Sequence, residues 1–192
     1  MHRKRCFWVP LNNPLYVSYH DDEWGVPIHD DHTLFEMLIL EGMQAGLSWI
    51  TILRKREGYR KAFDNFDIEK ILKYDESKVE ELMNNSEIIR NRLKINAVIK
   101  NAQAFLDVQK EHGSFDAFIW SYADNTPIRL IRTGENDVPV RCELSDRISK
   151  DLSKRGFKFI GSTIICAYMH AIGLIDGHTD DCFCSKNKVL RR

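Results

Sequence analysis

The chain has 192 residues, 43% of them hydrophobic, a size and composition typical of one compact domain or two small interlocked ones. No apolar run approaches the roughly 20 residues that a membrane span needs, and no signal-peptide core follows the basic start, so we expect a cytoplasmic protein. Basic and acidic residues both total 28, which gives a net charge of zero. Bulk charge therefore does not mark the chain as a nucleic-acid binder.

Helical periodicity dominates from residue 33 onward. The segment 33–36, Thr-Leu-Phe-Glu, has the pattern of a capping box that opens a helix. The apolar seam of this helix consists of Leu34, Leu38, Glu41 and Ala45. Gly46 and Leu47 interrupt the pattern, and Ser48 is the expected N-cap of a second helix.

The remaining elements are also predicted to be helices. Short ones are expected from Asp67 and Asp75, followed by a polar hairpin at 84–87. A long helix is expected from about 90 to 112, where Gly113 ends it. The last predicted helices cover 114–120, 145–155 and 164–173, and residues 123–142 are expected to be irregular. Because strand alternation is almost absent, the predicted fold class is all-α.

Five cysteines in a chain without a signal peptide argue against a disulfide framework and leave free thiols or metal ligands. Cys6 precedes His20 by fourteen positions, and His178 precedes Cys182 by four, a spacing that places both side chains on one face of a helical turn. Together they form a possible Cys2His2 metal site. A buried thiol with surface histidines is the alternative, and spacing does not exclude Cys184 as a ligand.

Glu41 occupies an apolar-seam position where leucine or alanine is expected. A buried carboxylate is costly unless it is paired, and such groups cluster at functional sites. Its neighbourhood is aromatic, since residues 16–24 contain two tyrosines and a tryptophan, and Trp8 adds another ring. Aromatic faces with a few polar groups suit a flat aromatic ligand. The alternatives are a structural glutamate with a local partner and an aromatic segment that belongs to the core.

Two basic segments are candidates for phosphate binding. Residues 86–94 form a hairpin that leads into a helix N-terminus flanked by Arg90, Arg92 and Lys94. Residues 154–159 mix bases with aromatic rings. For each segment the alternative is a solvated basic turn.

Several motifs, in order along nearly the whole chain, resemble the 3-methyladenine DNA glycosylase I family. They are Tyr16-x-x-Tyr19-His20-Asp21-x-Glu23-Trp24-Gly25, Glu41-Gly42-Met43-Gln44-Ala45-Gly46-Leu47-Ser48-Trp49, Ile88-Ile89-Arg90-Asn91-Arg92-x-Lys94-Ile95 and Gly156-Phe157-Lys158-Phe159. The resemblance implies a helix-hairpin-helix glycosylase fold in one catalytic unit, 1–192. Its two interlocked lobes would be a hairpin lobe at about 30–112 and a terminal lobe at about 1–29 and 113–192.

The same resemblance implies roles for individual residues. One structural zinc ion would join the two ends of the chain through Cys6, His20, His178 and Cys182. Glu41 and Tyr19 would contact the extruded base, within a pocket formed by Trp8, Tyr16, Trp24, Gln44, Ser48 and Trp49. DNA contacts would come from Gly46, Leu47, Ser86, Ile89, Arg90, Arg92 and Lys94. One residue departs from the family pattern, because Glu87 stands where glycine is usual, and its carboxylate is expected to weaken phosphate binding.

The implied activity is hydrolytic removal of N3-methyladenine from alkylated double-stranded DNA by a monomer, without lyase activity. Two other classes stay open from the residues alone. A non-catalytic DNA-binding module would have no use for Glu41 and Trp49. A zinc hydrolase or deaminase is disfavoured because neither His-Glu-x-x-His nor His-x-Glu with Cys-x-x-Cys is present. If DNA is the partner, zero net charge is the sum of a basic DNA-facing side and an acidic far side around residues 75–81.

Overall fold

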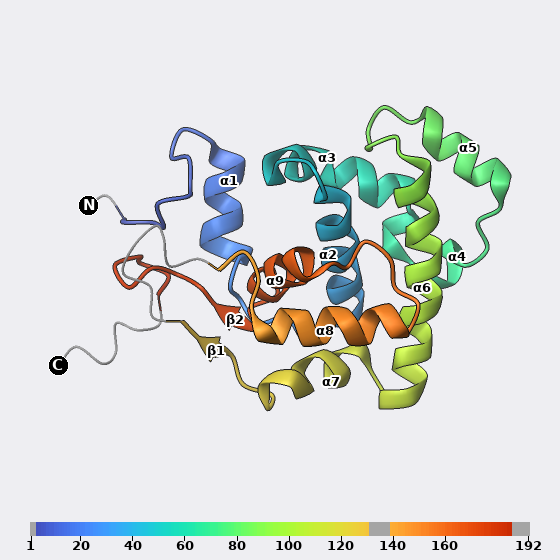
Figure 1. Ribbon diagram of the computed structural model, residues 1–192. Coiled ribbons are helices and arrows are strands. Elements are labelled where there is room, and N and C mark those ends of the chain that lie inside the picture. Colours follow the sequence, from blue (N-terminus) through green and yellow to red (C-terminus); the bar gives the residue numbers. More distant parts are fainter. Residues whose placement is uncertain (1–2, 131–138, 186–192) are drawn as a thin grey trace.

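The computed structural model describes residues 3–130 and 139–185 as an almost entirely helical fold (Figure 1). In chain order the elements are α1 (Pro14–Ser18), the π-helical turn η1 (Tyr19–Glu23), α2 (Asp31–Gln44), α3 (Trp49–Ala62), η2 (Asp64–Phe66), α4 (Ile68–Ile71), α5 (Glu76–Asn84), α6 (Arg92–His112), α7 (Phe115–Trp120), η3 (Ser121–Ala123), β1 (Ile128–Arg129), α8 (Glu143–Lys154), α9 (Ser162–Ala171) and β2 (Ile175–Asp176). None of the described helices is long and apolar enough to cross a membrane.

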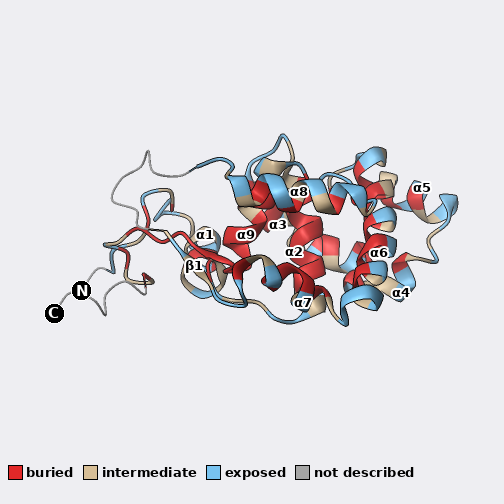
Figure 2. Ribbon diagram, turned by 60° about the horizontal axis from the view of Figure 1, so that its bottom comes forward, coloured by how far each residue is buried: buried red, intermediate tan, exposed pale blue. Residues whose placement is uncertain are grey.

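The central element is α2, which is buried on every side from Leu34 to Met43. Figure 2 shows it as a buried helix surrounded by elements with exposed outer faces. A helix without a polar face needs neighbours all round. On one side the hydroxyl of Tyr168 in α9 donates to the Leu34 carbonyl at 3.1 Å. The carboxyl-terminal half of this helix, which carries Glu41, is thus buried inside the protein.

Helix starts agree with the predictions where a short side chain caps the first turn. Asp67, Asp75 and Ser114 accept hydrogen bonds from backbone N–H groups three residues further on. The long helix α6 begins at Arg92 rather than 90, because Asn91 caps it through the Lys94 N–H. Gly113 ends it with a φ of +85°, a conformation that favours glycine.

The predicted start of α2 is wrong. The helix begins at Asp31, and its N-cap is Asp30, whose carboxylate accepts from the Thr33 N–H at 2.8 Å. Glu36 does not complete a capping box, because its carboxylate pairs with Arg56 and Arg60 of α3 instead. Tertiary ion pairing therefore overrides the local signal in the sequence.

The sequence interpretation also missed the elements at the two ends of the chain. Residues 14–23 form α1 and η1, although no helix is predicted there. The segment 123–142, expected to be irregular, includes β1, which pairs in parallel with β2 near the C-terminus, while its part 131–138 lies outside the described residues. Helices α8 and α9 each begin two residues earlier than predicted.

The first and last described segments lie side by side at the left of Figure 1. The backbone N–H of Phe183 donates to the Lys4 carbonyl at 2.8 Å, and the Lys4 ammonium pairs with Asp181 at 2.5 Å. Arg3 and Arg5 lie over the Phe183 ring. This junction brings residues about 175 positions apart in the sequence into contact.

Candidate functional site

A pocket of about 300 Å³ opens between η1, the carboxyl-terminal half of α2, the start of α3 and α9. Its lining consists of Trp8, Tyr16, Tyr19, Trp24, Glu41, Gln44, Trp49, Ala167 and His170. Most of these groups are aromatic. The pocket has the size and apolar character of a site for a small flat ligand.

Glu41 is the central polar group of this pocket. It is 3% exposed, and its Oε2 atom has no hydrogen-bond partner among the described residues. Burial raises the pKa of Glu41 from 4.5 to about 8. The contrast with Glu36, on the same helix, is informative. Burial alone would raise the pKa of Glu36, but hydrogen bonds from Arg60 and Arg56 outweigh it and leave the pKa below its ordinary value.

The aromatic rings surround Glu41 in two groups. Tyr19 and Trp49 are in contact, with centroids 5.3 Å apart and planes tilted by 51°. Trp8 and Trp24 meet edge to face at 4.8 Å. The indole Nε1 of Trp49 is, like Glu41 Oε2, buried without a hydrogen-bond partner in the described part of the chain. Buried polar groups are normally paired, so two unpaired ones beside an aromatic pocket indicate a site that binds a ligand with polar groups.

The structure brings together all but one of the residues assigned to the base pocket from the sequence. Ser48 does not line it, and its hydroxyl lies 2.8 Å from that of Thr51 at the exposed start of α3. The sequence interpretation missed Ala167 and His170. Both come from α9, more than 100 residues from the other lining residues, and the His170 ring stacks on Trp24 at 5.7 Å.

A second cluster, formed by two cysteines and two histidines, lies behind the pocket. Cys6, His20, His178 and Cys182 are all buried, and their ligand atoms lie within 4.8 Å of one another, an arrangement that could hold a metal ion. The pair 178 and 182 belongs to a turn rather than to the predicted helical turn, with the Cys182 N–H donating to the Thr179 carbonyl. Cys184 lies outside this set, in a second possible group with His20 and Asp21.

The distances within the four-residue cluster fit tetrahedral coordination. Cys6 Sγ and His178 Nδ1 are 3.6 Å apart, and Cys182 Sγ lies 3.5 Å from His20 Nε2 and 3.7 Å from His178 Nδ1. A zinc ion bonded to sulfur at about 2.3 Å and to nitrogen at about 2.05 Å would set these atoms roughly 3.6 Å apart. The residues therefore fit such an ion.

The partners of the two imidazoles support the same geometry. The second ring nitrogen of His20 lies 2.8 Å from the Asp21 carboxylate, and that of His178 lies 3.1 Å from the Trp24 carbonyl. Metal-binding histidines typically donate their other N–H to such acceptors, which fixes the tautomer. A hydrogen bond between the two thiol groups also lowers the pKa of Cys182 and raises that of Cys6.

The pocket and the cluster share a wall. Tyr19 and His20 are consecutive residues of η1, and the first lines the pocket while the second belongs to the cluster. Trp8 contacts the His20 ring edge to face at 5.3 Å, and Trp24 contacts the His178 ring at 4.8 Å. The cluster therefore supports the rings on which a ligand would stack.

The turn after α2 is exposed next to the pocket. Gly46 has a φ of +77°, and no atom lies within 4 Å of the position where its Cβ would be. Leu47 is 40% exposed, and its N–H donates to the Gln44 carbonyl at 2.6 Å. An apolar side chain thus projects into solvent at the mouth of the pocket.

The hairpin 85–91 packs closely on α3. A Cβ on Gly58 would lie 2.6 Å from the Glu87 carbonyl oxygen, so only glycine fits there. The Lys55 ammonium donates to the Ser86 carbonyl at 2.7 Å, and the Ile89 N–H donates to the Tyr59 hydroxyl at 3.1 Å. Glu87 itself is exposed and is not among the residues with positive φ, so a side chain is tolerated at this position.

The predicted separation of basic and acidic sides is wrong at α6. Arg92 forms ion pairs with Glu76 and Glu80 of α5, which belong to the acidic stretch. Arg155, from the basic segment 154–159, pairs with Glu111 at 2.5 Å. Lys94 is buried and donates to backbone carbonyls. Arg90 remains exposed, with no ion pair in the part of the chain that the structure describes.

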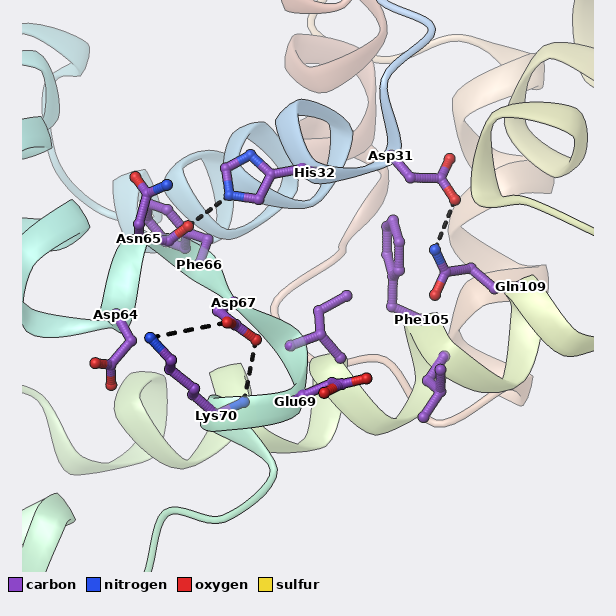
Figure 3. A pocket seen from close by; sticks show the side chains of 12 residues that line it. Asp31, His32, Asp64, Asn65, Phe66, Asp67, Glu69, Lys70, Phe105 and Gln109 are labelled. Atoms are coloured by element: carbon purple, nitrogen blue, oxygen red, sulfur yellow. Dashed lines mark hydrogen bonds and ion pairs between the residues drawn. The ribbon is translucent and has the colours of Figure 1, made fainter.

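A larger cleft of about 530 Å³ lies at the other end of α2, between η2, α4 and α6 (Figure 3). Asp31, at its edge, precedes Glu41 by ten residues, or about 15 Å along the helix. Its polar groups contact one another, since Asp31 accepts from Gln109, His32 contacts the Asn65 carbonyl and Lys70 pairs with Asp67. Among its described lining residues no buried polar atom is without a partner, and in this the cleft differs from the aromatic pocket.

Comparison with known proteins agrees with this helical fold and its aromatic pocket. The chain belongs to the methyladenine glycosylase family, whose sequence profile matches residues 8–185. It is 47% identical to DNA-3-methyladenine glycosylase 1 of Escherichia coli (strain K12), over 94% of this chain and 96% of that protein. It is equally identical to DNA-3-methyladenine glycosylase of Haemophilus influenzae, over 94% and 97% of the two chains.

Solved structures show the same relationship. A crystal structure of a 3-methyladenine DNA glycosylase I superposes with a TM-score of 0.91 at 48% identity, covering 94% of this chain and 99% of that one. A variant of a 3-methyladenine DNA glycosylase I in complex with 3-methyladenine matches with a TM-score of 0.87 at 38% identity, covering 88% and 91%. Both solved structures are named as 3-methyladenine DNA glycosylase I, and the second contains 3-methyladenine.

Proposed function

We propose that the protein is a DNA base-excision glycosylase that extrudes N3-methyladenine from alkylated duplex DNA and hydrolyses its glycosidic bond. The observation that carries this function is the unpaired, buried carboxylate of Glu41 inside an aromatic pocket. The family membership and the relatives named for 3-methyladenine support the same conclusion. We further propose the helix-hairpin-helix assignment, with the hairpin lobe at about 30–112, and action as a monomer.

Selection of the base follows from charge. Methylation at N3 makes the adenine cationic, so the base already carries a positive charge in DNA. Ring faces attract cations by roughly 0.5–2 kcal/mol each, and Trp49, Tyr19, Tyr16, Trp8 and Trp24 supply such faces. Ionising Glu41 at pH 7 costs about 1.4 kcal/mol, because its pKa of about 8 lies one unit above that pH. A cationic base offsets this cost, whereas neutral adenine does not.

Cleavage itself needs little acid catalysis. As the bond between C1′ and the base breaks, its electron pair neutralises the departing cation. Water then bonds to C1′ through its oxygen, and its second proton is released to solvent. No lysine is among the described residues that line the pocket, which supports hydrolysis by water rather than a Schiff-base intermediate. The contribution of the protein is therefore extrusion, binding of the cation and exclusion of bulk water.

Extrusion and DNA binding are assigned to the exposed elements around the pocket. Leu47, on the exposed turn formed with Gly46, would fill the gap that an extruded nucleotide leaves in the base stack. The hairpin that contains Ser86, Ile89 and Arg90 would hold the phosphate backbone. Gln44 lines the pocket beside Glu41 and would contact the base edge.

We also propose that the cluster of Cys6, His20, His178 and Cys182 binds one structural zinc ion. The donor set and the sulfur–nitrogen distances of 3.5–3.7 Å support this ion. Four protein ligands leave no open position, so the metal would stabilise the fold and would take no part in the reaction. Zinc would also fix the relative positions of the first and last described segments.

The test is release of free 3-methyladenine from methylated duplex DNA by the wild-type protein and by Glu41→Gln. We expect release by the wild type and a decrease of at least a hundredfold in the variant, with helicity and zinc content unchanged. Glu36→Gln, which alters another buried carboxylate of α2 away from the pocket, is the matched control for loss of charge. Equal release by wild type and Glu41→Gln would contradict the role of Glu41, and no release by the wild type would contradict the function.

A further inference from the structure

Lys94 lies in the first turn of α6, in a basic segment that suggested phosphate binding. The structure places its ammonium elsewhere. The side chain is 7% exposed, and its Nζ atom donates to the Met43 carbonyl at 2.8 Å and to the Ala45 carbonyl at 2.7 Å. Both acceptors belong to the carboxyl-terminal end of α2. Because both hydrogen bonds hold the ammonium inside the protein, it is not available to bind a phosphate at the surface.

These two hydrogen bonds satisfy backbone carbonyls at the carboxyl-terminal end of α2. The last carbonyls of a helix have no intrahelical partner and need one from elsewhere. Here the Gly42 carbonyl accepts from the Ala45 N–H, and the Gln44 carbonyl accepts from the Leu47 N–H. Lys94 binds two further carbonyls at this end, those of Met43 and Ala45. A positive charge at this end also complements the helix dipole.

The same end of α2 carries the groups that act on DNA in the proposed function. Ala45 immediately precedes Gly46 and Leu47, whose turn is exposed and makes few contacts of its own. Lys94, in contrast, is anchored. Its backbone N–H donates to the Asn91 side chain at 3.1 Å, at the point where the hairpin joins α6. A direct chain of bonds therefore connects the hairpin with the turn.

We propose that Lys94 is a positioning residue for base extrusion, which fixes the Gly46–Leu47 turn relative to the hairpin by binding the carbonyls of Met43 and Ala45. The inference rests on the proposed function and assigns Lys94 to the step in which Leu47 enters the duplex. With the turn fixed, binding of the phosphate backbone at the hairpin brings Leu47 to one defined place in the base stack. Without the ammonium, the chain leaves α2 in several directions, and insertion becomes slow.

This role predicts that loss of the Lys94 ammonium affects excision from duplex DNA but not binding of the free base. Glu41 and Trp49 lie on either side of the turn, and among the described residues no hydrogen bond or ion pair joins them to Lys94. We therefore expect binding of the free base not to depend on the ammonium. Excision from duplex DNA does depend on it, because the nucleotide must first leave the stack. A merely structural lysine would affect both measurements together, and a phosphate-binding lysine would change the salt dependence of duplex binding.

The experiment compares Lys94→Met, which has a similar length and no donor, with Lys94→Arg, which keeps the donors. Lys100→Met is the matched control, because it removes an exposed ammonium six residues further along the same helix. Three quantities are measured: equilibrium dialysis of free 3-methyladenine, single-turnover release of the base from methylated duplex, and the slope of log Kd against log salt for undamaged duplex. Lys94→Gln, which removes the charge but retains a neutral NH2 donor group, replaces Lys94→Met if that variant does not fold.

We expect Lys94→Met to bind free 3-methyladenine within twofold of the wild type, to release it from duplex at least tenfold more slowly and to keep the wild-type salt slope. Lys94→Arg restores release to within threefold, and Lys100→Met matches the wild type. Wild-type release by Lys94→Met, an equal loss of free-base binding, or a salt slope smaller by about one would each overturn the inference. Absence of release by the wild-type protein would instead refute the proposed function.

Discussion

Replacing Glu41 by glutamine is expected to stabilise the protein. The gain in the free energy of unfolding should grow as the pH rises from 4.5 to 8. The pKa of Glu41 is about 8 in the folded chain, against 4.5 for an ordinary glutamate. Below pH 4.5 the carboxyl group is protonated in both states and costs nothing. Above pH 4.5 the unfolded chain loses this proton while the folded chain keeps it, so the folded state becomes less favourable by about 1.4 kcal/mol per pH unit, up to pH 8. At pH 7 the cost is therefore about 3 kcal/mol.

Glutamine has the same shape and never ionises, so Glu41→Gln removes this cost. Urea unfolding of both proteins at several pH values between 5 and 8.5 measures it, because the contributions of all other titrating groups cancel in the difference. We expect the variant to exceed the wild type by less than 1 kcal/mol near pH 5 and by about 3 kcal/mol at pH 7.

Glu36→Gln is the control, because its expected effect on the free energy of unfolding has the opposite sign. Hydrogen bonds from Arg60 and Arg56 outweigh burial and hold the pKa of Glu36 below its ordinary value, so its charge stabilises the fold above pH 4.5 and this contribution is lost as the pH falls. Glu36→Gln should therefore be less stable than the wild type at pH 7, and the deficit should shrink toward acid pH. A difference for Glu41→Gln that does not change with pH would show that Glu41 ionises normally and would refute the argument.

Three further predictions concern excision, the metal and DNA affinity. Because Glu41 must ionise to bind a cationic base, kcat/KM for base release should rise tenfold per pH unit below pH 8 and level off above it; a flat profile from pH 6 to 9 would contradict this. Cys182→Ala should lose zinc, measured by atomic absorption, and unfold at a lower temperature, whereas Cys184→Ala should keep the ion; retention of zinc by the first variant would exclude its role as a ligand. Glu87→Gln should bind undamaged duplex two- to fivefold more tightly at low salt, with a smaller gain at high salt, and equal Kd values for both proteins would show that the carboxylate faces away from phosphate.

Local signals in the sequence were sufficient for several elements. Asp67, Asp75 and Ser114 cap their helices through contacts that span only three residues, so composition and order predict them. Burial of Glu41 followed from its place in an apolar seam. Spacing pairs the four residues of the Cys/His cluster but does not choose between metal ligands and isolated thiols, and only the family resemblance favours ligands.

Long-range contacts explain what the sequence did not predict. Asp30 and Thr33 are both acceptable N-caps for α2, and the choice depends on partners far along the chain: Asp31 accepts from the N–H groups of Phe115 and Asp116, and Glu36 pairs with α3. His170 joins the pocket only because α9 packs on α2. The burial of Lys94 depends on the end of another helix, so its charge could be read from the sequence but the direction of its ammonium could not.

The positions of the tryptophans allow ligand binding to be followed by intrinsic fluorescence. Trp8, Trp24 and Trp49 line one pocket, whereas the fourth, Trp120, donates its indole N–H to the Ile28 carbonyl away from it. Trp8 and Trp24 also contact imidazole rings of the Cys/His cluster. Intrinsic fluorescence should therefore respond both to a base that stacks in the pocket and to a metal ion bound behind it, while Trp120 supplies a constant background. Titration with either ligand can be followed on the unlabelled protein.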